Sequence, residues 1–261
     1  MIEDVLLSKP QKISNREVSV TIKPKAVLKW LLSIMLILVA LNTAGILLGE
    51  KFGEESFLAR NLKGFFDLNE ENNISAFFAS IALLIAAAAL YMVYLLQSAK
   101  YSSKKWHWLI LSIAFAFLAI DENTEIHEKL GDRLTASFGS DLPDYLQYAW
   151  VIPYGVAFIA AVAYFLPFVF KLPNKTRNLF IVSGFLFVGG AIGFEMIESY
   201  VFMNLDTSHI LYKILYTVEE ALEMCGVILF IYATLDYLTA NNKDLAIVRT
   251  DAPHRAKTGS N

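Results

Sequence analysis

The sequence has only one cysteine, and it has no nucleotide-binding glycine loop, no internal repeat and no low-complexity tract. A single cysteine, Cys225, cannot form an intrachain disulfide, and its place within an apolar run is typical of a small buried residue. The first 25 residues are polar and mixed in charge, so they do not resemble a cleavable signal peptide. The basic residues do not form a nucleic-acid surface, and we expect no nucleic-acid partner.

Apolar residues are abundant instead: they make up 56% of the 261 residues, and the mean hydropathy is +0.48. Soluble domains are usually less apolar, and ~20 apolar residues cross a ~30 Å hydrocarbon core. Three runs reach this length, the third with Pro153 and Pro167 inside it: Trp30–Leu48, Ala76–Leu96 and Ala149–Phe170. Three more are apolar over most of their length and have acids at one end: Trp106–Ile120, Leu179–Phe194 and Met224–Leu235. We therefore expect an all-α, polytopic membrane bundle with six transmembrane helices.

The basic residues predict the orientation of these helices. Sixteen of the 22 lysines and arginines lie in the two terminal tails and the second and fourth loops, all on one side of the expected bundle. Basic residues near spans are retained in the cytoplasm, so both termini are predicted to be cytoplasmic. The six spans occupy residues 29–240, between a polar tail at 1–28 and a tail at 241–261 that we expect to be disordered. Nineteen of the 25 acids lie toward the opposite, outer side, where they would concentrate cations.

Acids are found at the outer ends of three expected helices. They come from spans three, five and six: Asp121, Glu122, Glu125 and Glu128 with His127, then Glu195 and Glu198, then Glu219, Glu220 and Glu223. Since Asp121, Glu125 and Glu128 stand at i, i+4 and i+7, a continuous helix would place them on one face, with His127 to its side. All of these groups are expected at one membrane level.

The depth of these acids separates them from ordinary loop charges. Asp121 follows only 15 residues of its apolar run and Glu195 follows 16, a rise of ~22–24 Å against a core of ~30 Å. One ionised carboxylate in hydrocarbon costs at least ~2.5–3.5 kcal/mol. Several together require a counter-charge, protonation or a water-filled cavity; solvated helix-end charges are the simpler alternative.

Carboxylates and a histidine on facing helices are typical of metal sites in helical bundles. The predicted ligands are Asp121, Glu125, His127, Glu128, Glu195, Glu198, Glu219 and Glu223. This oxygen-dominated set favours Ca²⁺, Mn²⁺ or Fe over Zn²⁺. The chain lacks two Glu-x-x-His pairs, which favours a hard-cation site over a di-iron oxygenase. Glu122 and Glu220 are the candidate catalytic residues, as general bases. The alternative for His127 is a hydrogen-bonding or pH-sensitive residue that binds no metal.

Three further features concern this outer side. The alternation from Asp67 to Asn73 resembles part of a calcium loop, but it lacks the turn glycine and distal glutamate, and a polar turn that caps the second span is the alternative. His209 is another candidate ligand. Gly189 and Gly193 have the spacing of a helix-packing motif and are predicted to contact a neighbouring helix opposite Glu195 and Glu198.

A resemblance to uncharacterised bacterial membrane proteins rests on three acidic motifs. These are Asp121-Glu122-x4-His127-Glu128, Glu219-Glu220-x2-Glu223-Met224-x-Gly226 and Phe66-Asp67-x-Asn69-x-Glu71-x-Asn73. The chain resembles six-helix members of this group over spans two to six. The resemblance implies a place in the bacterial inner membrane and carries no activity.

Three classes of function are consistent with these features. The first is a metal-dependent enzyme that acts on a lipid or lipid-linked substrate. The second is a cation transporter or channel, which the nearly apolar inner halves of spans three, five and six disfavour. The third is a non-catalytic subunit that senses a metal ion or a proton. The expected partners are membrane lipid and a divalent cation, and association into a homo-oligomer is left open.

Overall fold

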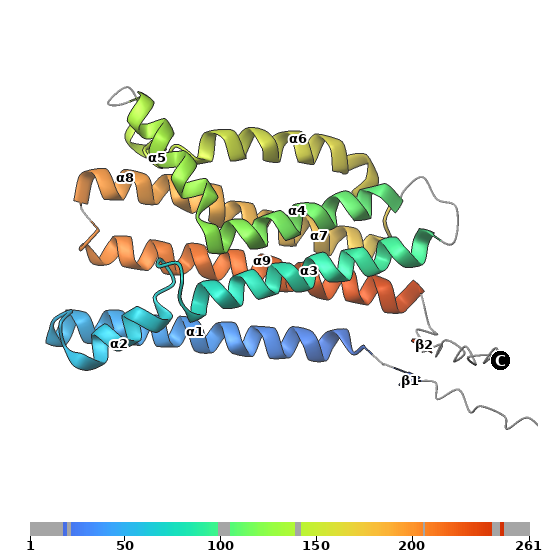
Figure 1. The fold of residues 1–261 in the computed structure, drawn as a ribbon, viewed down its shortest axis with the longest axis horizontal. Helices are drawn as coiled ribbons and strands as arrows, with labels where there is room; N and C mark the ends of the chain where they lie inside the picture. Colours follow the sequence, from blue (N-terminus) through green and yellow to red (C-terminus); the bar gives the residue numbers. More distant parts are fainter. Residues whose placement is uncertain are drawn as a thin grey trace, which may run out of the picture.

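The computed structural model describes residues 18–19, 22–98, 105–138, 142–205, 207–241 and 246–247. Within these ranges the chain is helical except for short turns and one pair of two-residue strands, so the all-α prediction is confirmed. The long helices lie side by side in one bundle (Figure 1). Strand β1 (Val18–Ser19) pairs antiparallel with β2 (Ala246–Ile247). The remainder of the predicted disordered tail after Asn241 lies outside the described residues.

Each of the six apolar runs lies in a long helix or in consecutive helical segments. These are α1 (Pro24–Phe52), α3 (Ile74–Ser98), α4 (Lys105–Thr124), α6 (Val151–Val169), the succession of α7 (Asn174–Val188), η3 (Gly189–Phe194) and α8 (Glu195–Leu205), and α9 (Ile210–Asn241). Helix α1 begins before the predicted boundary at residue 29, because Pro24 occupies the first helical turn, where its missing N–H costs no hydrogen bond. The 3₁₀ turn η2 (Asp144–Leu146) precedes α6.

Within the described ranges, four helical stretches are long and apolar enough to cross a membrane: Pro24–Phe52, Ile74–Gln97, Val151–Val169 and Asn174–Leu205. These stretches support insertion of the chain into a membrane. Helix α9 lies at the centre of the bundle, where it packs against α1, α3 and α7, while α4 packs on α3. The long helices α4 and α9, which are not among these four stretches, therefore pack against helices that are.

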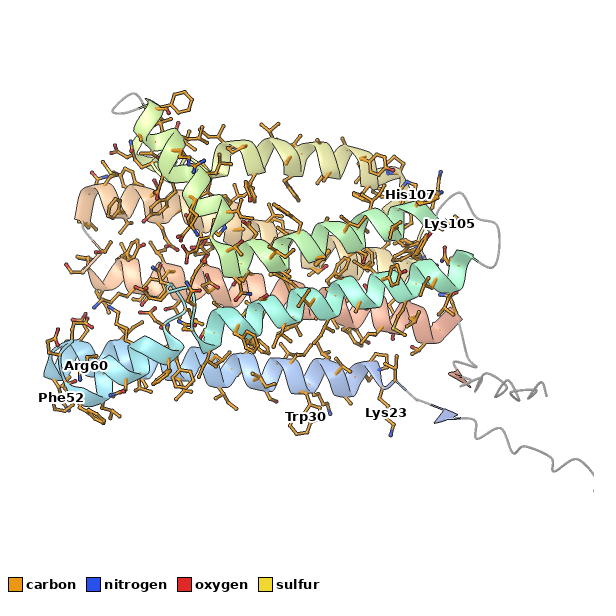
Figure 2. The ribbon with its side chains drawn as sticks, in the orientation of Figure 1. Lys23, Trp30, Phe52, Arg60, Lys105 and His107 are labelled. Carbon is orange, nitrogen blue, oxygen red and sulfur yellow. The ribbon has the colours of Figure 1, made fainter. Side chains whose placement is uncertain are left out.

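The half of the bundle away from the acids is filled by large apolar side chains. Ile228, Ile231 and Leu238 of α9 are completely buried. The Trp108 ring, also completely buried, stacks on Tyr237 at 5.0 Å and meets Phe168 edge-on at 5.1 Å. Lys23 and Lys105 lie at this end of the molecule, and Phe52 and Arg60 lie at the other (Figure 2).

Two short helices at the acidic end of the bundle were not predicted. Helix α2 (Phe57–Phe66) folds back along α1, where Gly45 allows Leu62 to approach closely. Helix α5 (Ile126–Phe138) leaves the bundle where α4 stops, and Glu125 between them adopts a left-handed φ of 54°. The prediction that Asp121, Glu125 and Glu128 share a face of one helix is therefore wrong, because the helix is broken between them.

Candidate metal centre

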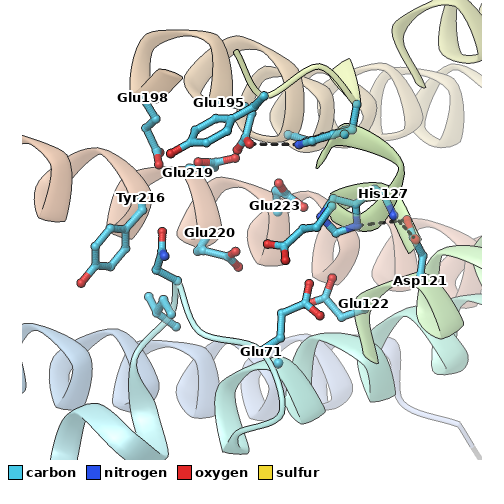
Figure 3. Close-up of a pocket in the computed structure, with 18 of the residues that line it drawn as sticks. Glu71, Asp121, Glu122, His127, Glu195, Glu198, Tyr216, Glu219, Glu220 and Glu223 are labelled. Atoms are coloured by element: carbon cyan, nitrogen blue, oxygen red, sulfur yellow. Dashed lines mark hydrogen bonds and ion pairs between the residues drawn. The ribbon is translucent and has the colours of Figure 1, made fainter. Parts of the chain in front are cut away.

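A cavity of about 340 Å³ lies where α4, α5, α8, α9 and the turn before α3 meet. Among the described residues, its lining includes eleven acids and one histidine, His127, but no lysine or arginine. The acids are Glu70, Glu71, Asp121, Glu122, Glu128, Asp132, Glu195, Glu198, Glu219, Glu220 and Glu223. The acidic segments that lie far apart in the sequence thus converge on one space, as Figure 3 shows.

Of the predicted site residues, Glu125 and the further candidate His209 do not line this cavity, and all the others do. Glu125 is held elsewhere. Its carboxylate accepts a hydrogen bond from Asn72 Nδ2 at 2.8 Å and pairs with Lys129 Nζ at 3.2 Å. The hydrogen bond with Lys129 holds the pKa of Glu125 below its usual value. After the break in the helix this side chain pairs with a basic partner and stays outside the cavity lining.

One group of close side chains contains Glu71, His127 and Glu128, each of which offers a ligand atom within 4.8 Å of the other two. Glu71 belongs to the polar turn before α3. In that turn Asn73 Oδ1 accepts the backbone N–H groups of Ser75 and Ala76 at 2.8 and 3.0 Å, so the capping interpretation is correct for Asn73. The same turn delivers Glu71 to the cavity.

Asp121 orients His127 rather than facing the cavity freely. Its Oδ2 lies 3.3 Å from His127 Nδ1 and accepts the Tyr154 hydroxyl at 3.0 Å, while its Oδ1 accepts the His127 backbone N–H at 3.0 Å. A carboxylate on one ring nitrogen fixes the imidazole orientation and leaves the other nitrogen for a ligand. The Trp150 ring packs edge-on against His127 at 4.9 Å and closes the other side.

The pKa values of Glu71, His127 and Glu128, the first group, are all raised, so these side chains retain their protons to higher pH. Burial raises the pKa of Glu71 to about 8, and the negative charge of Glu128 adds to this effect while His127 opposes it. Burial likewise raises the pKa of Glu128. Burial alone would lower the pKa of His127, but the hydrogen bond and charge of Asp121 outweigh it and raise that pKa. A cation that binds this group must displace these protons, so its affinity should rise with pH.

A second group consists of Glu195, Glu198 and Glu219, whose ligand atoms also lie within 4.8 Å of one another. Trp150 Nε1 donates a hydrogen bond to Glu195 Oε1 at 3.0 Å. Glu198 is only 2% exposed, and its Oε1 is buried without a hydrogen-bond partner. A buried carboxylate oxygen without a donor is costly, so this group calls for a cation or a proton.

The π-helical segment η3 sets the position of the second group. A Cβ at Gly190 would lie 2.9 Å from the Glu219 carbonyl oxygen, so the missing side chain lets η3 approach α9 closely. A Cβ added at Gly189 or Gly193 would have no neighbouring atom within 4 Å. The predicted helix packing through these two glycines is therefore wrong. The widened π turn shifts the helical register, which a uniform helical wheel could not anticipate.

Sequence reasoning missed the aromatic wall of the cavity and misjudged His209. Trp150 and Tyr154 bind acids directly, and the hydroxyls of Tyr148 and Tyr212 lie 3.1 Å apart. From the sequence, Tyr145, Tyr148 and Trp150 are expected only to mark an outer membrane boundary, and Tyr154 carries no prediction. His209 Nδ1 accepts the Leu211 backbone N–H at 3.1 Å at the start of α9, outside the cavity lining.

Comparisons with known proteins give one match. The model of a family described as a domain of unknown function, DUF8692, matches residues 31–238. No curated protein and no solved structure matches the chain. The matched range contains all six long helical stretches of the bundle except their outermost turns, together with every acid that lines the cavity. Because the match covers most of the chain, the protein belongs to the DUF8692 family.

Proposed function

We propose that this protein is a six-span membrane protein with cytoplasmic termini that binds divalent cations in the acidic cavity and uses them to act on a lipid or lipid-linked substrate. The uneven distribution of basic residues supports the orientation. Lys175 and Asp236 form an ion pair at 2.7 Å near the predicted cytoplasmic end. The resemblance of the acidic motifs to bacterial membrane proteins favours the bacterial inner membrane.

The observation that carries the proposal is the lack of any lysine or arginine among the described residues that line the cavity, against eleven acids. Carboxylates so close together repel one another, and a medium of low dielectric strengthens the repulsion. One histidine cannot compensate them. Each divalent cation supplies two positive charges, so fewer bound ions compensate the acids than with monovalent cations or protons.

Exposed apolar side chains support a position of the acids within the membrane. Tyr200 and Met203 of α8, beyond the second acidic group, are 53% and 48% exposed. Ile214, five residues before Glu219 on α9, is 51% exposed. The apolar surface therefore continues on the outer side of the acids as well as on the inner side. A water-filled cavity loaded with cations meets the requirement that charges within the hydrocarbon be compensated.

The donor set fits a hard divalent ion. Carboxylate oxygens predominate, and His127 adds one nitrogen. Such a set suits Ca²⁺, Mn²⁺ or Fe better than Zn²⁺. Buried oxygens without hydrogen-bond partners, Glu71 Oε2 and Glu198 Oε1, lie in the two groups of close ligands. A cation would satisfy both.

The lining also supports chemistry on an amphiphile. A divalent ion lowers the pKa of a bound water and so supplies a nucleophile. Glu122 and Glu220 line the cavity and belong to neither close group, which leaves them to accept a proton as general bases. Leu83, Leu118 and Phe187 give the same cavity an apolar wall. A volume of about 340 Å³ accommodates part of a small substrate, such as a lipid headgroup region.

Transport is the less favoured function because the inner half of the bundle is filled. Below the acids, the space between Leu83, Glu223 and Val227 amounts to about 10 Å³, room for one water at most. Further inward, Ile228, Ile231 and Trp108 are completely buried. A cation path to the cytoplasm would need these side chains to separate.

The test is metal retention by the purified protein. After solubilisation in mild detergent without chelator and exposure to Mn²⁺ or Ca²⁺, elemental analysis should find a divalent ion bound to the wild type. Replacing Glu195 and Glu219 together by glutamine should reduce this content, whereas the control Glu125→Gln should keep it. A wild-type protein that holds no divalent ion under any of these conditions would overturn the proposal.

The catalytic part is tested with lipid extracts. Metal-loaded protein incubated with a bacterial lipid extract should release a product that mass spectrometry detects and that a chelator abolishes. Glu220→Gln and Glu122→Gln should lower the rate while the metal content stays. If product formation is identical in wild type and both variants, neither residue is the general base.

A further inference from the structure

The described residues of the cavity contain two groups of close ligand atoms, and the two groups share no residue. Within the described residues, Glu71, His127 and Glu128 form one, and Glu195, Glu198 and Glu219 form the other. We propose that the cavity binds two divalent cations at once, one in each group. This inference rests on the proposed function and specifies the number and kind of ions that the site takes.

The two groups are built on different parts of the fold. The first takes Glu71 from the turn before α3, and His127 and Glu128 from α5, outside the long helices. The second takes Glu195 and Glu198 from α8 and Glu219 from α9, inside the bundle. Figure 3 shows Glu195, Glu198 and Glu219 together on one side of the cavity and Glu71 beside Glu122 on the other. Each set of ligand atoms lies within 4.8 Å internally and the two sets share no residue, so each offers its own position for an ion.

Each group also contains an unsatisfied oxygen. In the second group it is Oε1 of Glu198, a side chain that is only 2% exposed and lines the cavity. In the first it is Oε2 of Glu71. These oxygens are buried away from donors, although a buried acceptor normally finds one. With an ion in one group only, the oxygen of the other group would need a proton as its partner.

The charge of the cavity favours two ions over one. Eleven acids line it among the residues that the structure describes. One divalent ion would compensate two of these charges, and two ions would compensate four. Glu223, which lines the cavity from α9 together with Glu219, remains available as a further ligand. Proteins that hold two metal ions in one site commonly use carboxylates of this kind.

The two positions differ in chemistry. His127 gives the first a nitrogen ligand, which suits Mn²⁺ and Fe²⁺, while the second offers only carboxylate oxygens and accepts Ca²⁺ as well. Mn²⁺ should therefore fill both, and Ca²⁺ should displace Mn²⁺ preferentially from the second. The probe of choice is Mn²⁺, with Ca²⁺ as the competitor.

The experiment is an equilibrium titration of the full-length, detergent-solubilised protein with Mn²⁺. The wild type should bind two ions per chain, and excess Ca²⁺ should release one of them at a concentration at least tenfold below that needed for the other. The control Glu125→Gln should also bind two. A wild type that binds one ion would overturn the two-ion inference and leave the proposed function intact, and a wild type that binds none would overturn both.

Variants assign the ions to the groups. Glu198→Gln with Glu219→Gln should leave one ion that Ca²⁺ displaces poorly, and Glu71→Gln with His127→Ala should leave one that Ca²⁺ displaces readily. Loss of both ions from a monodisperse variant would show that the positions are not separate and would overturn the assignment. If a variant fails to fold, the count and the Ca²⁺ competition on the wild type decide the question.

Discussion

Asp121 holds His127 at two points: one carboxylate oxygen lies 3.3 Å from the ring Nδ1, and the other accepts the backbone N–H of the same residue at 3.0 Å. The carboxylate therefore fixes both the ring and the first turn of α5. This arrangement explains how a residue just beyond a break in the helix keeps a defined direction toward the cavity. It also makes Asp121 a residue that positions a ligand.

Replacing Asp121 should weaken cation binding without removing a direct ligand. Asp121→Asn would leave the ring without its negative partner, and loss of such a partner typically costs about 10–100-fold in metal affinity. Competition with a chelating dye measures the change. The control Tyr154→Phe removes only the hydroxyl that reaches Asp121 at 3.0 Å and should have a smaller effect. Unchanged affinity in Asp121→Asn would rule out the positioning role.

The stability of the metal-free protein should fall as pH rises from 5 to 8. Glu71 keeps its proton to about pH 8 when folded, against an ordinary value of 4.5, because burial and the charge of Glu128 oppose its ionisation. Glu128 is shifted in the same direction by burial, and His127 gains its raised pKa from Asp121. The folded protein thus binds more protons than the unfolded chain in this window, so its stability decreases with pH.

The measurement is the thermal midpoint of chelator-treated protein at half-unit pH steps. Excess Mn²⁺ should reverse the trend, because ions replace the protons more easily at higher pH. Glu71→Gln should flatten the metal-free curve near pH 8, where this group would otherwise titrate. A midpoint that stays level or increases between pH 5 and 8 without metal would contradict the expected sign.

Helices α7 and α9 should not tolerate a methyl group at Gly226. A Cβ there would lie 2.7 Å from the Phe187 backbone nitrogen and 2.8 Å from the Ser183 carbonyl oxygen, and backbone atoms cannot move aside. Gly226→Ala should therefore cost about 1–3 kcal/mol through overpacking and lower the thermal midpoint. Gly184 of α7 has nothing within 4 Å of the same position. Gly184→Ala should keep or raise the midpoint, because alanine favours a helix.

Lys213 should contribute to stability and not to cation binding. This buried side chain of α9 donates hydrogen bonds to Glu50 at 2.8 Å and to Glu54 at 2.7 Å, and so ties α9 to the outer end of α1. Because both partners are about half exposed, water can replace the ion pairs, and Lys213→Met should cost only about 1 kcal/mol. The matched change Lys63→Met, at 3.7 Å from Glu54 and exposed, should cost less. Chelator competition should show the same metal affinity in both variants.

The positions of the long helices could be read from the sequence, because each apolar run is long and helix spacing is regular. The convergence of Asp121, Glu195 and Glu219 followed from the same regularity, since acids at equal depth on packed helices must meet. The sequence also showed that Glu71 belonged to an acidic segment near this level. Six spans and the orientation remain proposals that rest on the charge pattern.

The details that failed were those in which the helix is not regular. Glu125 has a left-handed backbone conformation, which a glutamate in the sequence does not predict. The segment η3 forms the wider turns of a π-helix between Gly189 and Phe194. Each changes the direction of every side chain that follows. The aromatic wall was missed for a different reason: Trp150 and Tyr154 have the character of membrane-boundary residues, and only the fold shows that they bond to Glu195 and Asp121.

The turn at Glu125 has a mechanical consequence. Helix α5 is joined to α4 through one left-handed residue, and it rests on Trp150 at Gly131. An ion shared by Glu71, His127 and Glu128 would cross-link this short helix to the turn before α3. Removing the ion would then remove this link at the rim of the cavity, while the apolar half of the bundle around Trp108 and Ile228 would keep its packing.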